Sequence, residues 1–329
     1  MSGLTIKDVG EFGLIQRISH DFIYRPELVK IPSGDDGAVY EIPPGYDQVI
    51  STDTMVDGIH FTNQTMKAFE VGYHLAASNI SDMAAMGAEA VGMVISLSLP
   101  DDLPVDWVES CYDGIRACAR KYRVNIFGGD VTGARGALVL TGTVIGMVPS
   151  GTAVPRSGAR KGDVVFVTHT IGDSAAGLHV LLHGMEEDYP YLAGRHKMPE
   201  PQIELGMILR KAGAHALNDI SDGLSRELNE IALASHVEIE IMENQIPLSE
   251  EIRRLGRETG ISPLSWAYNG GEDYQLVGTI SPEDFDKIKG ERNITPIGKV
   301  IKKPGNGVYI IKDNKKELLR IQGFDHFSQ

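Results

Sequence analysis

The chain has 329 residues, which is more than a single hydrophobic core usually accommodates, so two domains are expected. Its 45 Asp and Glu residues outnumber 31 Lys and Arg residues and give a net charge of -14, which disfavours nucleic acid and anionic membranes as partners. No apolar run approaches the roughly 20 residues that span a bilayer. Charged residues interrupt the start of the chain, so we expect no signal peptide and a cytoplasmic location.

The first half alternates helix and strand patterns. Apolar residues at helical spacing predict a helix over 10–24, and strands are expected at 38–42 and 48–52 on either side of a Pro-Pro-Gly turn. A helix over 67–86, a strand at 90–99, a helix over 105–122 and strands at 125–127 and 137–148 follow. This order predicts a mixed α/β fold with partly antiparallel sheets.

A break at Pro149-Ser150-Gly151-Thr152 divides the pattern, which predicts an N-terminal domain over 1–149 and a C-terminal domain over 150–329. The second domain begins with a strand at 163–168 and a helix over 173–183, followed by an irregular stretch over 184–202. Helices are expected over 203–213, 223–235 and 249–259, and strands near 236–242, 274–280, 294–301 and 307–311. Both domains are therefore expected to be α/β.

Seven aspartates stand at corners of the chain that are rich in glycine, serine or threonine. They are Asp35, Asp36, Asp53, Asp82, Asp130, Asp219 and Asp222. Carboxylates that converge repel each other, by roughly 4 kcal/mol for a close pair at an intermediate dielectric. Hard divalent cations such as Mg²⁺ are the usual partners of such oxygen ligands. The first hypothesis is therefore metal-assisted phosphate chemistry, although the chain has no P-loop and no protein-kinase motif.

Asp82 lies in a segment apolar enough to be buried, where an ionised carboxylate is costly unless it is paired or bound to metal. Asp219 and Asp222 bracket Ser221 just before a predicted helix. N-capping would explain Asp222 or Ser221 but not Asp219, whereas a metal-bound phosphate at the helix N-terminus would suit both carboxylates. His60, Glu272 and Arg156 also stand in turns. For each of these three, an ordinary structural or surface role is the alternative to ligand contact.

Nine motifs, in order along essentially the whole chain, together resemble thiamine-monophosphate kinase. They are Gly10-Glu11-Phe12-Gly13-Leu14-Ile15, Gly34-Asp35-Asp36, Ser51-Thr52-Asp53 with Gly58-Ile59-His60-Phe61, Ser81-Asp82-Met83-Ala84-Ala85-Met86-Gly87-Ala88, Gly128-Gly129-Asp130, Gly172-Asp173-Ser174-Ala175-Ala176-Gly177-Leu178, Asp219-Ile220-Ser221-Asp222-Gly223-Leu224, Gly271-Glu272-Asp273-Tyr274 and Gly323-Phe324-Asp325-His326-Phe327. Any one of them alone would be a weak signal.

The resemblance implies a fold shared with aminoimidazole ribonucleotide synthetase. Two α/β domains are then expected, with N-terminal sheets from two subunits pairing into a dimer barrel and a C-terminal sheet covered by helices that completes the active site. It also implies the reaction of ATP with thiamine monophosphate to give ADP and thiamine diphosphate, by direct in-line transfer assisted by Mg²⁺.

Site residues follow from the same resemblance, motif by motif. Magnesium ligands correspond to Asp36, Ser51, Thr52, Asp53, Asp82, Asp130, Asp219 and Asp222. Contacts to ATP correspond to Tyr112, Gly129, Asp130, Arg156 and Ser221, and contacts to the acceptor correspond to His60, Glu272 and Phe324. No general base is needed because a phosphate monoester, with a second pKa of about 6, is already largely ionised; Arg156 supports the transfer. Gln202 departs from the family pattern, which usually has arginine there.

Two other functions stay open on sequence alone. One is another ATP-using enzyme of the same fold group, such as an aminoimidazole ribonucleotide synthetase. The other is a non-catalytic protein whose acidic loops hold Ca²⁺, although the spacing of a calcium-binding loop is absent. The number of metal ions, the order of substrate binding, the acceptor specificity and the oligomeric state do not follow from the sequence.

Overall fold

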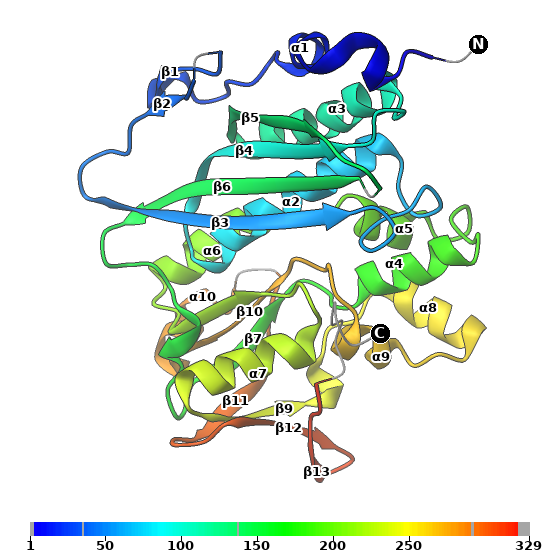
Figure 1. The fold of residues 1–329 in the computed structure, drawn as a ribbon. Coiled ribbons are helices and arrows are strands. Elements are labelled where there is room, and N and C mark those ends of the chain that lie inside the picture. Colours follow the sequence, from blue (N-terminus) through cyan, green and yellow to red (C-terminus); the bar gives the residue numbers. More distant parts are fainter. Residues whose placement is uncertain (1–2, 35, 137, 291–292, 322–329) are drawn as a thin grey trace. The chain divides into compact units, whose positions relative to one another are not determined.

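A computed structural model describes residues 3–34, 36–136, 138–290 and 293–321 (Figure 1). The chain divides into two compact units. Unit 1 takes the described residues within Met1–Met83 and Glu89–Gly151, and unit 2 those within Ala84–Ala88 and Thr152–Gln329. Each unit contains its own sheet and helices, which confirms the predicted mixed α/β class. Over the described ranges, no helix is both long and apolar enough to cross a membrane.

Unit 1 is built on a four-stranded sheet. Its elements are α1 (Ile6–Ile18), η1 (Pro26–Leu28), β1 (Val29–Ile31), β2 (Val39–Tyr40), β3 (Tyr46–Val56), α2 (Ala68–Ala85, whose last two residues belong to unit 2), β4 (Glu89–Leu99), α3 (Val105–Tyr122), β5 (Asn125–Gly133) and β6 (Val139–Pro149). The sheet order is β3-β6-β4-β5, with β4 and β5 parallel and the other neighbours antiparallel. The strands β1 and β2 form a separate antiparallel pair.

Small residues let α2 approach both the sheet and α3. A Cβ atom added to Gly72 of α2 would lie 1.8 Å from the carbonyl oxygen of Cys111, and one added to Gly114 of α3 would lie 1.9 Å from that of Phe69. The two helices therefore cross with backbone against backbone. Against the sheet, a Cβ atom on Gly142 of β6 would lie 2.4 Å from the side-chain nitrogen of Asn79. The glycines thus fix the position of α2 on the sheet.

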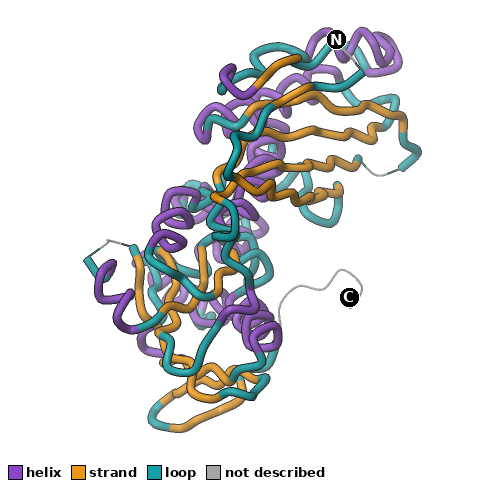
Figure 2. Tube along the Cα trace, turned by 90° about the vertical axis from the view of Figure 1, so that its left-hand side faces the viewer, coloured by secondary structure: helices purple, strands orange, loops and turns teal. Residues whose placement is uncertain are grey.

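Unit 2 is built on a seven-stranded sheet (Figure 2). Its elements are η2 (Arg156–Gly158), β7 (Val164–Thr168), α4 (Asp173–Leu182), α5 (Pro190–Lys197), α6 (Ile203–Lys211), β8 (Ala216–Asp219), α7 (Leu224–Ser235), β9 (Glu238–Met242), η3 (Glu243–Gln245), α8 (Glu250–Thr259), α9 (Pro263–Asn269), β10 (Leu276–Ile280), α10 (Pro282–Ile288), β11 (Ile294–Lys302), β12 (Gly307–Lys312) and β13 (Lys315–Leu318). The strand order is β13-β12-β9-β11-β7-β10-β8, and only β12 and β9 pair in parallel.

Helices cover this sheet, as predicted, and the structure shows them on both faces. Alternate residues of one strand pack on opposite sides, because side chains alternate across a sheet. Val165 and Val167 of β7 belong to a buried cluster with Leu228 of α7. Phe166, between them, belongs to a second cluster with Leu209 of α6. The sheet is therefore the central layer of unit 2.

The prediction of an irregular stretch over 184–202 is wrong, because α5 lies within it. This helix has only eight residues, too few to show a helical period, and its first position is Pro190, which suits a helix start. Its buried Leu192 and Ala193 pack in a third apolar cluster. Two further short helices, α9 and α10, were also missed, although both follow a serine with a proline at the first helical position.

We expect Gly72→Ala to destabilise the protein by about 2 to 3 kcal/mol, because the new methyl group would overlap the backbone of α3. The matched control is Gly194→Ala in α5, where an added Cβ atom meets nothing within 4 Å. That change should be neutral or stabilising by up to about 1 kcal/mol. Thermal unfolding followed by near-ultraviolet circular dichroism measures both. Equal unfolding temperatures for Gly72→Ala and wild type would contradict the close crossing.

Candidate functional site

Strand β3 carries Ser51, Thr52 and Asp53 at one edge of the unit 1 sheet. Asp53 pairs in register with Gly142, which faces Asn79 of α2, so Ser51 and Asp53 lie on the face that α2 covers. Thr52 lies on the opposite face, where its hydroxyl group is 3.1 Å from that of Thr143. Of the three predicted ligands, two therefore share a face.

Helix α2 completes this group of residues. The Asn79 side chain is fully buried; its Oδ1 atom accepts a hydrogen bond of 3.2 Å from the backbone N–H of Asp53, and its Nδ2 atom donates to the carbonyl oxygen of Leu75. Asp82 follows three residues later on α2 and is half-buried, so it lies near Asn79 on the helix surface. Ser51, Asp53 and Asp82 thus lie on one side of the sheet, with Asn79 fixing the β3 backbone.

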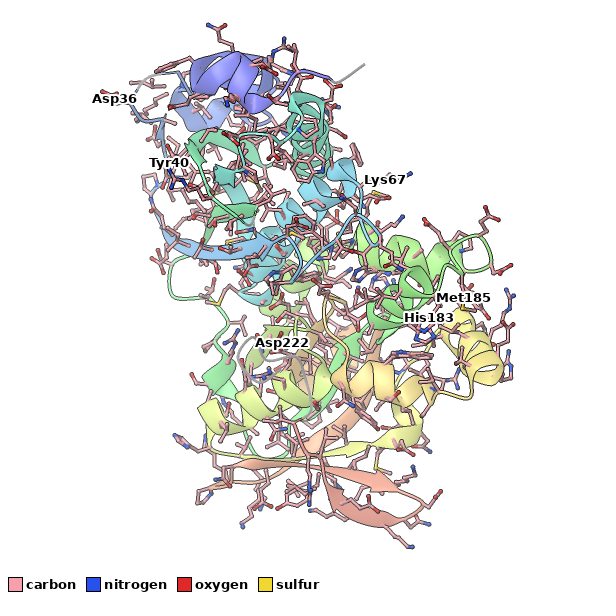
Figure 3. All side chains as sticks on the ribbon, turned by 45° about the vertical axis from the view of Figure 1, so that its right-hand side comes forward. Asp36, Tyr40, Lys67, His183, Met185 and Asp222 are labelled. Carbon is pink, nitrogen blue, oxygen red and sulfur yellow. The ribbon has the colours of Figure 1, made fainter. Side chains whose placement is uncertain are left out.

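A second acidic group lies at the opposite edge of the sheet. Asp130 of β5 is exposed and pairs in register with the exposed Ser96 of β4. Gly129, beside it, approaches β4 so closely that an added Cβ atom would lie 1.8 Å from the carbonyl oxygen of Ile95. The exposed Asp36 (Figure 3) is in the turn after β1. Ser33 of this turn lies near Gly128. Asp35 lies outside the described residues.

The sheet separates these two groups. Strands β3 and β5 are its two edges, with β6 and β4 between them, so Asp53 and Asp130 are roughly 14 Å apart across three strand spacings. Through the pairing of the four strands, Asp53 is level with Gly129, the residue before Asp130. Side chains at successive positions of a strand point to opposite faces, so Asp53 and Asp130 lie on opposite faces of the sheet. No single ion can therefore bridge these two carboxylates of one sheet. Within the described part of the chain, no three His, Cys, Asp or Glu side chains gather closely enough to hold a metal ion.

His60 and Tyr112, also predicted to contact ligands, differ in their surroundings. The Nδ1 atom of His60 accepts a hydrogen bond of 3.1 Å from the backbone N–H of Val56, so a neutral His60 ring carries its proton on Nε2. Tyr112 is only 3% exposed and its ring stacks on Phe22, with centroids 6.1 Å apart. Burial raises the pKa of its hydroxyl group. The structure therefore places Tyr112 in the core of unit 1. Phe324 lies outside the described residues.

In unit 2, two loops that are distant in sequence lie against each other. One is the loop from Asp219, which ends β8, to the start of α7; the other is Asn269–Tyr274, which precedes β10. The backbone N–H of Glu272 donates to the carbonyl oxygen of Ser221 at 2.7 Å. A Cβ atom on Gly271 would lie 2.2 Å from that same oxygen, so glycine is required there. The contact places the predicted acceptor residue Glu272 beside the predicted nucleotide residue Ser221.

Arg156 joins the first of these loops. Its Nε atom donates to Oδ1 of Asn218 at 2.8 Å, and its Nη1 atom lies 3.0 Å from Oε2 of Glu230. Asn218 precedes Asp219 on β8 and also donates to the carboxylate of Glu227. Arg156 is thereby held next to the aspartate loop of unit 2.

Glu227, in the first turn of α7, lies against this loop and has a raised pKa. Burial raises its pKa to about 8, and the charges of Asp219, Glu230 and Asp222 add to the shift. Asp219 itself is only 4% exposed. The region concentrates negative charge in a poorly solvated place, where a hard cation with oxygen ligands would be stabilised. The chemistry of the donor atoms therefore fits Mg²⁺.

Glu272 is held from its other side by α5. Its Oε2 atom lies 3.4 Å from Nδ1 of the buried His196, which also contacts the hydroxyl group of Ser174 at 3.2 Å. The next residue, Asp273, accepts hydrogen bonds from the backbone N–H groups of Gly172 and Ser174 at the start of α4. Glu272 has a positive φ of 65°, an unusual conformation that these contacts maintain.

Gln202, which stands where the family usually has arginine, lies just before α6. Its Nε2 atom donates to the carbonyl oxygen of Glu200 at 2.6 Å. Burial and the nearby charge of Arg195 lower the pKa of His169, and a hydrogen bond with Gln202 opposes that shift. Gln202 thus contacts Glu200 and His169, the residue that follows β7.

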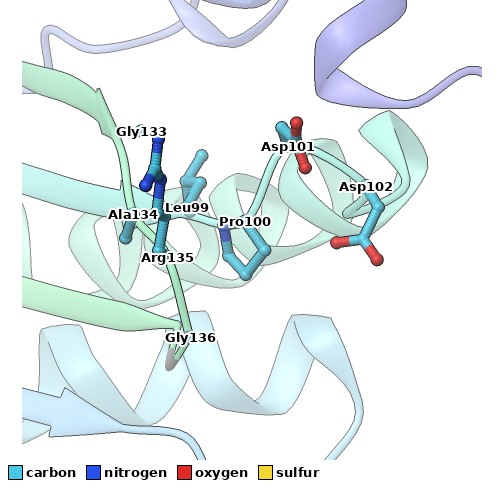
Figure 4. A pocket seen from close by; sticks show the side chains of 8 residues that line it. All are labelled: Leu99, Pro100, Asp101, Asp102, Gly133, Ala134, Arg135 and Gly136. Carbon is cyan, nitrogen blue, oxygen red and sulfur yellow. The ribbon is translucent and has the colours of Figure 1, made fainter.

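A cavity of about 580 Å³ in unit 1 does not coincide with these groups (Figure 4). It lies where the parallel strands β4 and β5 end, between Leu99 and Gly133, and its charged lining residues are Asp101, Asp102 and Arg135. None of the residues predicted to bind metal, nucleotide or acceptor lines it. We therefore place the candidate site on the acidic groups and not in this cavity.

Comparison with known proteins gives the class. The family described as AIR synthase related protein, N-terminal domain, matches residues 34–148, and its C-terminal domain counterpart matches residues 160–311. The fold and the acidic groups thus define a two-domain protein of the AIR synthase related class.

The relatives give the family. Thiamine-monophosphate kinase of Bacillus subtilis (strain 168) is 38% identical over 330 residues, which cover 96% of this chain and 99% of the relative. The crystal structure of thiamine-monophosphate kinase from Stenotrophomonas maltophilia K279a matches 94% of this chain and 98% of its own with a TM-score of 0.81 and 33% identity. A structure of AaThiL complexed with AMPPCP and TMP matches 99% of this chain and 100% of its own, with a TM-score of 0.78 and 34% identity. This chain belongs to the thiamine-monophosphate kinase family, as its motifs predicted.

We expect the stability of unit 2 to depend on the ionisation of Asp273. Burial raises its pKa to about 7 from 3.8, despite two backbone hydrogen bonds that favour the anion. A folded pKa above the unfolded value means that the stabilising contribution is complete below pH 3.8 and is lost as the pH rises to about 7. Across this window the free energy of unfolding of wild type should fall relative to Asp273→Asn, by at most about 1.4 kcal/mol per pH unit.

The measurement is urea unfolding without divalent ions, in a Trp107→Phe background where Trp266 of unit 2 is the one tryptophan left of two. Asp273→Asn also loses stability from one mismatched hydrogen bond, and this loss does not change with pH. Only the pH dependence of the difference in free energy of unfolding between the two proteins is therefore informative. A difference that does not change between pH 4.5 and 7.5 would show that Asp273 does not titrate in this range.

Proposed function

We propose that this chain is an ATP-dependent kinase that phosphorylates thiamine monophosphate to thiamine diphosphate. The observation that carries the proposal is the match, over 99% of this chain at 34% identity, to a family structure that holds AMPPCP and TMP together. AMPPCP is an ATP analogue that cannot transfer its terminal phosphoryl group. Simultaneous binding of donor and acceptor supports direct transfer between them.

The oxygen ligands of both units fit a magnesium-dependent reaction. Asp36, Ser51, Thr52, Asp53, Asp82, Asp130, Asp219 and Asp222 would hold Mg²⁺. Because β3 and β5 separate Asp53 from Asp130, more than one ion is required to use them all. Mg²⁺ bound to these oxygens would neutralise charge on the nucleotide phosphates.

The remaining residues then orient the reactants. The acceptor is a phosphate monoester, which is a nucleophile near neutral pH without a general base. Arg156, fixed by Asn218 and Glu230, would support the nucleotide phosphates, and Gly129, Asp130 and Ser221 would contact the nucleotide. Tyr112 is not carried into this set because its side chain is buried against Phe22. Alignment and charge neutralisation are sufficient for a loose phosphoryl transfer.

We also propose a homodimer formed through unit 1. Strand β3 is an 11-residue edge of the sheet, and exposed edges of this length are normally covered. On it, Ile50 is 69% exposed and Tyr46 is 41% exposed. A second copy of the chain packed against β3 would bury these apolar side chains and would pair or cover the exposed strand edge.

The proposed activity is tested by a coupled assay for ADP release with thiamine monophosphate, with thiamine and without an acceptor. We expect release only with thiamine monophosphate and Mg²⁺, since thiamine lacks the nucleophilic phosphate and the acidic groups need the cation. Each condition is repeated with EDTA. Equal release from thiamine, or release that survives removal of Mg²⁺, would reject this reaction.

We expect Glu272→Gln and His60→Ala to raise the acceptor KM at least fivefold while the ATP KM changes less than twofold. Steady-state kinetics with each substrate varied in turn measure the split. The control for Glu272 is Glu186→Gln, because Glu186 pairs with Lys197, the α5 residue next to His196, at 2.7 Å. The control for His60 is His20→Ala, an exposed histidine of unit 1. Equal rises in both KM values would assign these residues to the nucleotide or to the fold.

A further inference from the structure

We propose that Glu227, in the first turn of α7, is a positioning residue that holds the nucleotide-binding loop Asp219–Gly223 and Arg156 in one arrangement. The inference rests on the proposed function, which gives Arg156, Ser221 and the two aspartates of this loop their roles. Neither the motif resemblance nor the family match assigns Glu227.

The contacts of Glu227 converge on the loop from the helix behind it. Its Oε1 atom accepts a hydrogen bond of 3.2 Å from the backbone N–H of Asp222 and lies 3.4 Å from the hydroxyl group of Ser221. Its Oε2 atom accepts a hydrogen bond from Nδ2 of Asn218. One carboxylate therefore ties the last strand residues of β8 to the middle of the loop.

Arg156 is connected through the same carboxylate. Asn218 uses its amide nitrogen toward Glu227 and its amide oxygen toward Nε of Arg156, at 2.8 Å. The chain of contacts runs Arg156, Asn218, Glu227, and then Ser221 and Asp222. Loss of the Glu227 carboxylate would break the connection between Arg156 and the loop, and would leave each held only by its other partners, Glu230 for Arg156 and the Glu272 N–H for Ser221. Glu227 need not touch a ligand to have this effect.

The chemistry of this position requires a carboxylate. Three donors share its two oxygens, and the side chain is 2% exposed, so water cannot replace a lost acceptor. Glutamine has one acceptor oxygen and would turn an N–H group toward one of the donors. Aspartate keeps both oxygens but is one methylene shorter and cannot reach all three donors.

The charge of this position suggests a role beyond folding. Two further acids lie beside this buried side chain: Asp222, whose backbone N–H bonds to Glu227, and Glu230, whose Oε2 atom lies 3.4 Å from Nδ2 of Asn218. A residue selected only to pack α7 would not need to be an acid at this position. Residues that stabilise a ligand site commonly cost stability in the empty protein.

The test compares wild type with Glu227→Gln and Glu227→Asp in full-length protein. We expect Glu227→Gln to weaken binding of AMPPCP with Mg²⁺ at least tenfold in isothermal titration calorimetry, and Glu227→Asp to fall between the two. In protein without metal, amide hydrogen exchange at residues 219–223 should be at least tenfold faster in Glu227→Gln, because the hydrogen bond from the Asp222 N–H is lost. The acceptor KM should change less than twofold.

Asn229→Ala is the matched control, because Asn229 lies on α7, is 8% exposed and donates a hydrogen bond to the carbonyl oxygen of Ser225 in the same helix. We expect this variant to bind AMPPCP within twofold of wild type. Asn218→Ala combined with Glu227→Gln should weaken binding by less than the product of the single effects, since both act through one connection.

Binding by Glu227→Gln within twofold of wild type would overturn the inference and leave the proposed function intact. An equal loss in Asn229→Ala would also overturn it, because general packing of α7 would then explain the effect. Failure of the wild-type protein to bind AMPPCP with Mg²⁺ would instead reject the proposed function, and this inference with it.

Discussion

The burial of acidic side chains at strand ends and turns is the constraint on which the structure depends. An ionised carboxylate away from water is costly, and the pKa values of about 8 for Glu227 and about 7 for Asp273 report that cost. Hydrogen bonds offset part of this cost. Backbone N–H groups at the start of α4 donate to Asp273, and the Asn218 amide and the Asp222 N–H donate to Glu227. These hydrogen bonds therefore hold the acidic side chains in position, which is expected of a protein that presents oxygen ligands to a cation.

Those contacts also make the loops of unit 2 rigid. The close approach of Gly271 to the Ser221 carbonyl oxygen leaves no room for a side chain, and the N–H groups of Glu272 and Tyr274 bond to the neighbouring loop. Glu272 is further held by His196. Groups placed before the ligand arrives need little reorganisation when it binds, and alignment of donor and acceptor is the main requirement of phosphoryl transfer. Structure and proposed function thus agree in unit 2.

The sequence predicted the α/β class and both acidic loops, because glycine-aspartate corners and helix periods are local patterns. It could not show that Asp53 and Asp130 occupy opposite sheet edges, since strand order depends on pairing between distant segments. Asn79, Asn218 and Glu227 were missed for the same reason: each is recognisable only by the partner it meets in the fold. One local signal for Glu227 did exist, an acid in the first turn of a helix that follows an aspartate loop. The burial of Tyr112 likewise became visible only once α3 was packed.

Counting divalent ions on the protein tests the central claim most directly. Electron paramagnetic resonance of Mn²⁺, in the presence of AMPPCP, gives the number of ions bound per chain. The account predicts more than one ion on the wild-type protein, and fewer on Asp53→Asn and on Asp219→Asn, each with an unchanged fold. The same number of ions on all three proteins would contradict the claim that these carboxylates hold the cations of the reaction.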